Sequence, residues 1–269
     1  MATAPARAGD PTVPRHVPGT ASGIPTPASG LAARLASRLA GWHPALAAAV
    51  VGVAGFVPLF LLSLLGGVLV RDVLSGSVVG DWDSEISRWF ADRRTPALNT
   101  ASYIGSQLAG IWEVPVGMAI AVGALFLLRH WRWGGVLLIG ITLEGALYAS
   151  ITYVFSRERP AVPRLEDLIH NDSFPSGHTA AAMVMYGGIA LVVAAATRKR
   201  AWRALAWSAA VLVPPFVAWS RIYRGMHFMT DTFVGVLIGL GCLVVAMFAT
   251  HVGGLVAERR GASRREVAT

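Results

Sequence analysis

The sequence predicts an all-α protein, a polytopic membrane protein built as a bundle of six transmembrane helices. Two observations support this fold class. Hydrophobic residues make up 54% of the 269-residue chain, charged residues make up 14%, and the mean hydropathy is +0.56, which is typical of integral membrane proteins. The second observation is a set of long uncharged apolar segments. Residues 44–70 form the clearest one, and about 20 apolar residues are enough to cross the hydrocarbon core.

The apolar segments predict six crossings. They lie at residues 44–70, 114–128, 133–155, 177–196, 204–219 and 228–250. A secretory signal peptide is the alternative for the first, but this segment is too long and no cleavage site of small residues follows it. The second is short and depends on the milder stretch 98–112 beside it. The fifth contains Pro214 and Pro215, which a membrane helix tolerates as a kink.

The rest of the chain is predicted to form two tails and a helix on the membrane surface. We expect residues 1–43 to be a disordered tail ending in a short interfacial helix, residues 44–250 to be the transmembrane domain, and residues 251–269 to be a basic tail. Before the second crossing, Ile86 and Trp89 belong to an amphipathic pattern typical of a helix lying on the interface. Such a helix serves either as an anchor or as one wall of a lipid access path.

The basic residues are distributed unevenly along a chain whose net charge is +8. Clusters at 198–203 and 259–265 lie on the side of the membrane that holds both termini, whereas basic and acidic residues nearly balance on the other side. By the positive-inside rule, both termini are cytoplasmic. The charge is therefore assigned to topology, and no nucleic acid partner is predicted. The single cysteine, Cys242, excludes an intramolecular disulfide.

Polar residues with catalytic potential follow the third and the fifth crossing, in the loops "SRERPAVPRLEDLIHNDSFPSGH" and "SRIYRGMHFMTD". Both loops are predicted on the non-cytoplasmic side, so four helix ends would bring their side chains into one pocket. The candidate site residues are Arg157, Arg159, Ser176, Gly177, His178, Arg221, His227 and Asp231.

These residue types suit phosphoryl transfer through a phosphohistidine. A helix that begins at Ser176–Gly177 presents free N–H groups to an anion, and arginine forks match phosphate oxygens. His227 and Asp231 have i,i+4 spacing, so on a helix the carboxylate would hold one imidazole nitrogen protonated and leave the other as the nucleophile. His178 would act as the acid and base. A metal site formed by the two histidines and Asp231 is the alternative, although the neighbouring arginines would repel a cation.

The motifs resemble those of the type 2 phosphatidic acid phosphatase superfamily, in its membrane-bound lipid phosphatase branch. "PSGH" matches the second signature, "SRIYRGMHFMTD" matches SRxxxxxHxxxD, and Arg159-Pro160 ends the first, KxxxxxxRP; the resemblance covers about residues 80–250. It implies a six-helix phosphatase that needs no metal or cofactor. It also implies that Arg159, Ser176, Gly177 and Arg221 bind phosphate, that His178 is the general acid, that His227 is the nucleophile and that Asp231 is its partner.

One position departs from the family's first signature. Its lysine would fall at Thr152, and the only lysine of the chain is Lys199, on the cytoplasmic side. We expect Arg157 to supply the missing phosphate-binding charge, with Arg164 as a weaker candidate. Glu144, in the middle of the third crossing, lies about 22 Å from Arg159 along a helix. It is expected to be structural, with lipid-tail gating or helix pairing as alternatives.

The sequence therefore predicts a metal-independent lipid phosphatase of the cell's inner membrane, with its active site on the extracytoplasmic face. The expected substrate is a polyprenyl diphosphate or a phosphatidate-type lipid, because a pocket at bilayer level favours amphiphiles. A phosphotransferase on the same scaffold and a non-enzymatic lipid or anion transporter are the two alternatives. Transporters usually bind near the midplane between repeats, and no repeat is visible here.

Overall fold

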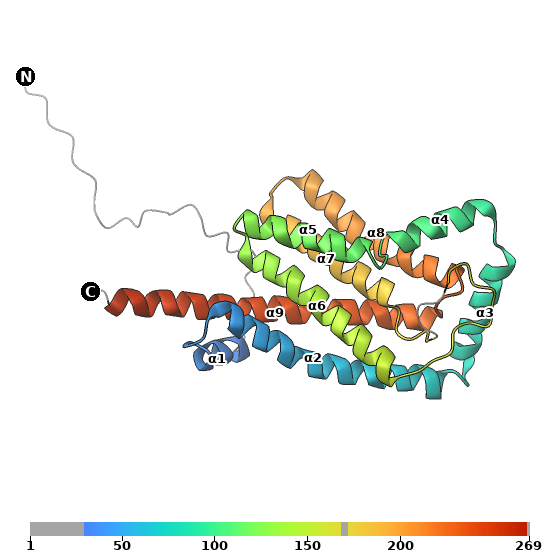
Figure 1. Cartoon of the computed structure of the whole chain (residues 1–269), viewed down its shortest axis with the longest axis horizontal. Coiled ribbons are helices and arrows are strands. Elements are labelled where there is room, and N and C mark those ends of the chain that lie inside the picture. Colours follow the sequence, from blue (N-terminus) through green and yellow to red (C-terminus); the bar gives the residue numbers. More distant parts are fainter. Residues whose placement is uncertain (1–29, 168–171, 268–269) are drawn as a thin grey trace, which may run out of the picture.

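The computed structural model describes residues 30–167 and 172–267, and every element in these ranges is a helix (Figure 1). The all-α prediction is therefore confirmed for the described part, while most of the predicted disordered tail lies outside it. The elements are α1 (Gly30–Arg38), α2 (Pro44–Val68) with the π-helical turn η1 (Leu69–Leu74), α3 (Val78–Asp92), α4 (Pro96–Gln107), α5 (Glu113–Leu127), α6 (Trp131–Val154), α7 (Gly177–Ala196), α8 (Arg200–Tyr223) and α9 (Met229–Val267).

Five of the six predicted crossings are helices long and apolar enough to span a membrane. They are Pro44–Leu74, Trp131–Val154, Gly177–Ala196, Arg200–Tyr223 and Met229–Ser263. The segment predicted as the second crossing forms α5, which is apolar but has only 15 residues, fewer than the hydrocarbon core requires. The milder stretch before it forms a separate helix, α4, instead of extending α5.

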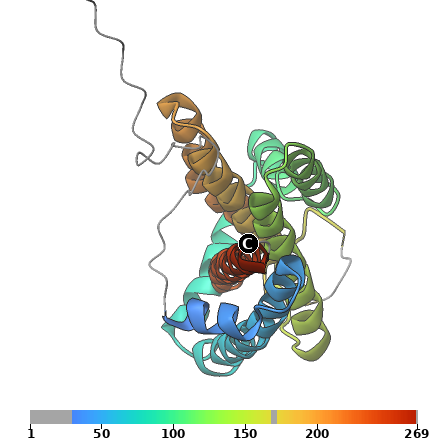
Figure 2. The same cartoon turned by 90° about the vertical axis from the view of Figure 1, so that its left-hand side faces the viewer.

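Helix α9 lies at the centre of the bundle, and Figure 2 shows the other long helices around it. It packs against α2, α6 and α7, and α7 packs in turn against α8. Small residues allow the α7–α9 contact: a Cβ atom on Gly239 would lie 2.5 Å from the Cβ of Met183, and one on Gly235 would lie 2.7 Å from the carbonyl oxygen of Ser176. Because the backbones approach this closely, the beginnings of α7 and α9 lie side by side.

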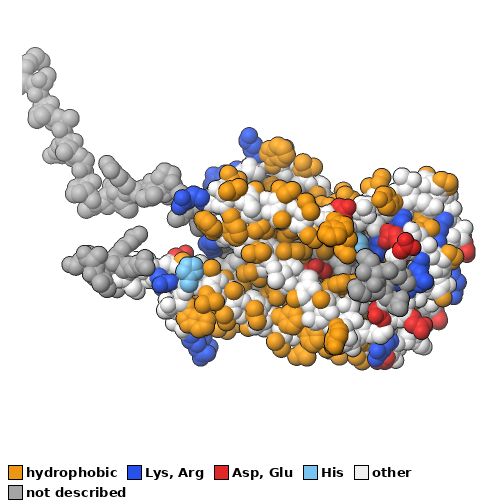
Figure 3. Space-filling model, viewed as in Figure 1, with side chains coloured by type: hydrophobic (Ala, Val, Ile, Leu, Met, Phe, Trp, Pro, Cys, Tyr) orange, Lys and Arg blue, Asp and Glu red, His pale blue; other side chains and the backbone are white. Residues whose placement is uncertain are grey.

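The two ends of the bundle differ. At one end, α1 packs against α9 through Ala32, Ala36 and Val252. Helix α9 continues to Val267, so the predicted boundary at residue 250 falls inside one helix. At the other end, α3 crosses the bundle and contacts α8, α9 and η1 (Figure 1). Figure 3 shows a hydrophobic belt between the two ends of the bundle. Acidic and basic side chains gather together at its right-hand end, where Figure 1 shows α3.

Candidate functional site

A cavity of about 740 Å³ lies near the end of the bundle that carries α3 and α4. Helices α4–α8 and the loops before α7 and α9 contribute to its wall. The cavity continues between α5 and α6 toward the middle of the bundle. Five of the eight predicted site residues line it: Arg159, Gly177, His178, Arg221 and His227. The structure therefore brings the two histidines and two of the arginines, which lie far apart in the sequence, to one cavity.

His227 is held by a main-chain atom. Its ring is 4% exposed, and Nδ1 lies 2.5 Å from the carbonyl oxygen of Ser173. A carbonyl oxygen only accepts hydrogen bonds, so Nδ1 carries the proton and Nε2 is free to act as a base or nucleophile. Burial, together with the positive charges of Arg221 and Arg159, holds the pKa of His227 well below its ordinary value of 6.5. The ring is therefore neutral at physiological pH.

The predicted partnership between His227 and Asp231 is wrong in its geometry. Helix α9 begins at Met229, so His227 precedes the helix and the i,i+4 spacing does not stack the two side chains. The carboxylate of Asp231 instead accepts the N–H of Phe228 at 2.9 Å and forms an ion pair with Arg157. The Ser173 carbonyl takes the place that the sequence argument gave to Asp231.

Arg157 does not line the cavity, which corrects its predicted role as a phosphate ligand. Its guanidinium is buried between two carboxylates: it is paired with Asp231, and Nη2 lies 3.0 Å from Oδ2 of Asp83. It also donates to the hydroxyl of Thr230 at 2.9 Å and lies over the ring of Phe228. Asp83 accepts the N–H of Thr230 at 3.0 Å, so this network connects α3 to the start of α9.

Arg221 is the most enclosed cation of the cavity. Its side chain is buried, and Nη1 donates to Ser106 at 2.6 Å and to Glu166 at 2.5 Å. Its Nε is buried and has no hydrogen-bond partner among the described residues. Since a buried donor without an acceptor is costly, an anion in the cavity would satisfy it. Arg159 donates to the carbonyl oxygen of Met226, and burial and the charge of Arg221 lower its pKa.

Glu166 is a cavity residue that the sequence argument did not identify. It forms ion pairs with Arg221 and Arg224. Burial alone would raise the pKa of Glu166, but the interactions with Arg221 and Arg224 outweigh it and the pKa is lowered. No local pattern marks this residue, because its partners lie more than 50 positions later in the chain.

The start of α7 contributes main chain to the cavity. Gly177 is the first residue of the helix and lines the cavity, and a Cβ atom there would lie 2.8 Å from the ring of Tyr148. Ser176 precedes it but does not line the cavity, because its buried hydroxyl is 2.9 Å from that of Thr179. The predicted anion site at this helix end therefore relies on backbone N–H groups, with no contribution from the Ser176 side chain.

Comparisons with known proteins agree with the motifs. The sequence profile of the PAP2 superfamily matches residues 133–252. A protein of Escherichia coli K12 named "Putative undecaprenyl-diphosphatase YbjG" is 31% identical over 168 residues, which cover 55% of this chain and 79% of that protein. The chain belongs to the PAP2 superfamily. The resemblance inferred from "PSGH" and "SRIYRGMHFMTD" is thereby confirmed.

A solved PAP2 structure shares the architecture. The crystal structure described as the first transmembrane PAP2 type phosphatidylglycerolphosphate phosphatase, from Bacillus subtilis, matches with a TM-score of 0.60 and 26% identity, over 71% of this chain and 93% of that one. The LpxE structure from Aquifex aeolicus matches at 29% identity over 61% and 93% of the two chains, with a TM-score of 0.48.

Among the described residues, no further cation takes the place of the signature lysine of PAP2 proteins in the cavity wall. Thr152 donates to the carbonyl oxygen of Tyr148 at 2.9 Å and does not line the cavity. Neither Arg157 nor Arg164 lines it either, so Arg159 and Arg221 are the cations of the wall among the described residues. The structure also offers no support for the alternative metal site, since Asp231 is bound by Arg157 instead of facing the histidines.

Proposed function

We propose that this PAP2 protein is a metal-independent membrane phosphatase that hydrolyses a phosphomonoester or diphosphate of a lipid through a phosphohistidine. The arrangement of His227 carries the proposal: Nδ1 is bound to the Ser173 carbonyl, and the ring lines a cavity together with two arginines. The family and the names of the relatives, an undecaprenyl-diphosphatase and a phosphatidylglycerolphosphate phosphatase, support this reaction class.

In the first step, Nε2 of His227 attacks phosphorus in line, and the N–P bond forms as the P–O bond to the lipid breaks. Arg159, the Nε of Arg221 and the N–H of Gly177 bind the non-bridging oxygens, where the negative charge lies. Once the anionic phosphate offsets the charges of the two arginines, His178 can hold a proton, which it donates to the leaving oxygen. The leaving group is then an alcohol when the substrate is a monophosphate and a lipid monophosphate when it is a diphosphate.

In the second step, water cleaves the phosphohistidine. His178, now unprotonated, takes a proton from the water, which attacks phosphorus as the N–P bond breaks. Inorganic phosphate leaves, and both histidines return to their starting states. Asp231 acts as a positioning residue in this scheme: it holds the N–H of Phe228 and the guanidinium of Arg157, and thereby fixes the backbone next to His227.

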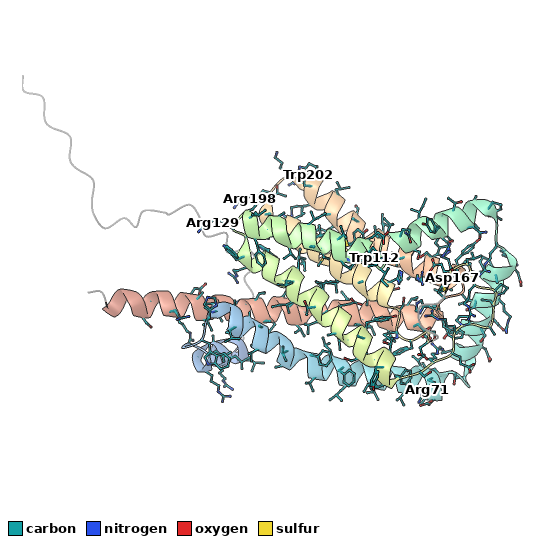
Figure 4. The ribbon with its side chains drawn as sticks, viewed as in Figure 1. Arg71, Trp112, Arg129, Asp167, Arg198 and Trp202 are labelled. Atoms are coloured by element: carbon teal, nitrogen blue, oxygen red, sulfur yellow. The ribbon has the colours of Figure 1, made fainter. Side chains whose placement is uncertain are left out.

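Exposed aromatic and basic side chains support the proposed placement in the membrane. We assign six crossings, with α5 as the short second one, and an interfacial position to α3, on which Trp82 and Trp89 are exposed. The basic end with Arg129 and Arg198, labelled in Figure 4, is assigned to the cytoplasm with both termini, and the cavity to the extracytoplasmic side of the inner membrane. Within this frame, residues 44–250 form the phosphatase domain.

The shape of the cavity favours a lipid substrate. Beyond the phosphate site, its wall between α5 and α6 is formed by apolar side chains, among them Met118, Val122, Leu138 and Ile141. A hydrocarbon chain would bury apolar surface there, whereas a soluble phosphate ester would leave the groove unfilled. The phosphate end would remain between Gly177 and the two arginines.

Phosphate release from dioctanoyl phosphatidate and farnesyl diphosphate, by purified protein in detergent containing EDTA, tests the proposal. We expect release from at least one lipid, and a loss of at least about 10³-fold in the His227→Ala variant. When the phosphate group of the lipid substrate is radiolabelled, an alkali-stable phosphoryl group should appear on the wild-type protein and not on the His227→Ala variant. Loss of activity on chelation, or full activity of His227→Ala, would contradict the mechanism.

The same assay separates the two alternatives named from the sequence. A phosphotransferase would pass the phosphoryl group to an added acceptor alcohol and yield a new phosphate ester in place of inorganic phosphate. A transporter would release no phosphate from any lipid. Analysis of products with and without an acceptor alcohol therefore distinguishes all three.

A further inference from the structure

Glu144 is a buried carboxyl of the cavity wall that the proposed reaction does not use. It lies on α6 with 6% exposure and lines the cavity together with Tyr148 and Gly145. It forms no hydrogen bond or ion pair with any residue in the described ranges. The sequence argument separated it from the chemistry by its distance from Arg159 along the chain, yet the two residues line the same cavity.

The depth of Glu144 relative to the phosphate site follows from the helix. The ring of Tyr148 lies against Gly177, whose N–H belongs to the proposed phosphate site. Glu144 precedes Tyr148 by one turn, which places it about 6 Å nearer to the middle of the bundle. A lipid whose phosphate lies at Gly177 therefore presents to Glu144 the atoms that immediately follow its phosphate group.

The chemistry of this position selects among lipids. A carboxylate at membrane depth is costly without a cation beside it, so the neutral carboxyl is favoured, and that form both donates and accepts hydrogen bonds. In an acylglycerol phosphate, ester groups lie a few bonds from phosphorus, and their carbonyl oxygens accept hydrogen bonds. A polyprenyl monophosphate has only hydrocarbon at that depth and would leave the buried carboxyl unpaired.

We propose that Glu144 recognises an ester carbonyl of the substrate, so that the protein prefers acylglycerol phosphates to polyprenyl monophosphates. This inference rests on the proposed phosphatase function and deepens it by naming the substrate class. Sites that bind a polar group of the substrate discriminate strongly against analogues without that group. The apolar wall around Leu138 and Ile141 does not provide this discrimination, because it accommodates either kind of hydrocarbon chain.

The test compares three lipids under the same conditions: dioctanoyl phosphatidate, its dioctyl ether analogue without carbonyls, and farnesyl monophosphate. For the wild type we expect the lowest KM with the ester lipid. Glu144→Leu should raise that KM by about tenfold and leave kcat nearly unchanged, which corresponds to the loss of one hydrogen bond. The same variant should not raise KM for the ether or the farnesyl lipid. Glu144→Gln, which keeps a neutral donor, should resemble the wild type.

Leu138→Ala is the matched control, since it removes a contact with the hydrocarbon tail and should raise KM for all three lipids alike. Equal KM values of the wild type for the ester and ether lipids would overturn the inference even if Glu144→Leu fails to fold. An equal effect of Glu144→Leu on all three lipids would also overturn it. If the wild type hydrolyses none of the lipids, the proposed function fails. Direct binding then decides the inference: a loss of affinity in Glu144→Leu confined to the ester lipid supports it, and its absence overturns it.

Discussion

At the residue scale, a main-chain oxygen sets the state of His227. The carbonyl of Ser173 accepts the proton of Nδ1, and the surrounding burial and arginine charge keep the ring neutral. In the proposed mechanism, His227 is therefore ready to act as the nucleophile without a carboxylate partner. The same environment makes protonation of this ring unfavourable in the folded protein, which has a measurable consequence for stability.

We predict that His227 makes the fold acid-sensitive. Its pKa is depressed in the folded state, so the unfolded chain, with a pKa near 6.5, binds a proton that the folded chain does not. Stability is therefore fully present above pH 6.5 and is lost as pH falls toward the folded-state pKa. At pH 5.5 the loss is about 1.4 kcal/mol relative to neutral pH.

Unfolding midpoints of the wild type and of His227→Gln, measured at pH 7.5 and 5.5, check this prediction. Glutamine remains neutral and can still donate to Ser173, so the variant should lose less stability on acidification. Carboxylates remote from residue 227 contribute equally to both proteins and cancel in the comparison. An identical pH dependence of the two proteins would show that His227 is not held neutral by the fold.

At the scale of single elements, the network of Asp83, Arg157 and Asp231 holds α3 against the beginning of α9. All three side chains are buried, and Arg157 lies between the two acids. Removing the arginine would leave two carboxylates facing each other away from water. The position of α3 and the geometry of the chain next to His227 therefore depend on the same cation.

Arg157→Ala should destabilise the protein by about 3–5 kcal/mol, since it breaks a buried ionic network. Arg71→Ala is the matched control, because Arg71 lies at the same end of the molecule but pairs with Asp72 on the surface, where solvent screens the pair, so this variant should change stability far less than Arg157→Ala. Denaturant unfolding in detergent measures both. Where Arg157→Ala remains folded, KM for a lipid phosphate should be unchanged; a selective rise in KM would mean that Arg157 binds phosphate after all.

Comparison of the predicted and observed helices shows which features of the fold and of the site could be predicted from the sequence. The beginnings of the long apolar helices, among them α7 at Gly177, were predicted within a few residues, because hydrophobic length and helix-start residues are local signals. The end of α9 was not, because this helix continues beyond its apolar part to Val267. The predicted partnership of His227 and Asp231 was wrong because it placed both residues on one helix, whereas α9 begins at Met229. Glu166 and Asp83 were missed because their partners, Arg221 and Arg157, are distant in sequence and only tertiary packing brings them together.

At the scale of the whole molecule, close packing of α7 on α9 brings the two histidine segments together. Gly239→Ala would place a Cβ atom 2.5 Å from that of Met183 and should force the helices apart, at a cost of about 1–3 kcal/mol together with reduced activity. Gly123→Ala on α5 is the control: nothing lies within 4 Å of its new Cβ atom, so helix propensity should leave it neutral or slightly more stable. Unfolding midpoints and phosphate release of the two variants check this, and equal behaviour would contradict it.

The distribution of charge over the whole molecule predicts its orientation in the membrane. Because the chain has a single cysteine, cysteine labelling can test this orientation. Cys242 is fully buried, so the wild-type chain should not react with a membrane-impermeant maleimide. Asp167 and Arg198, labelled in Figure 4, are exposed at opposite ends of the bundle. If the cavity faces away from the cytoplasm, Asp167→Cys should be labelled in intact spheroplasts, and Arg198→Cys only after permeabilisation. The reverse pattern would place the cavity, and with it the release of phosphate, on the cytoplasmic side. The basic residues at the Arg198 end would then face outward, against the positive-inside rule.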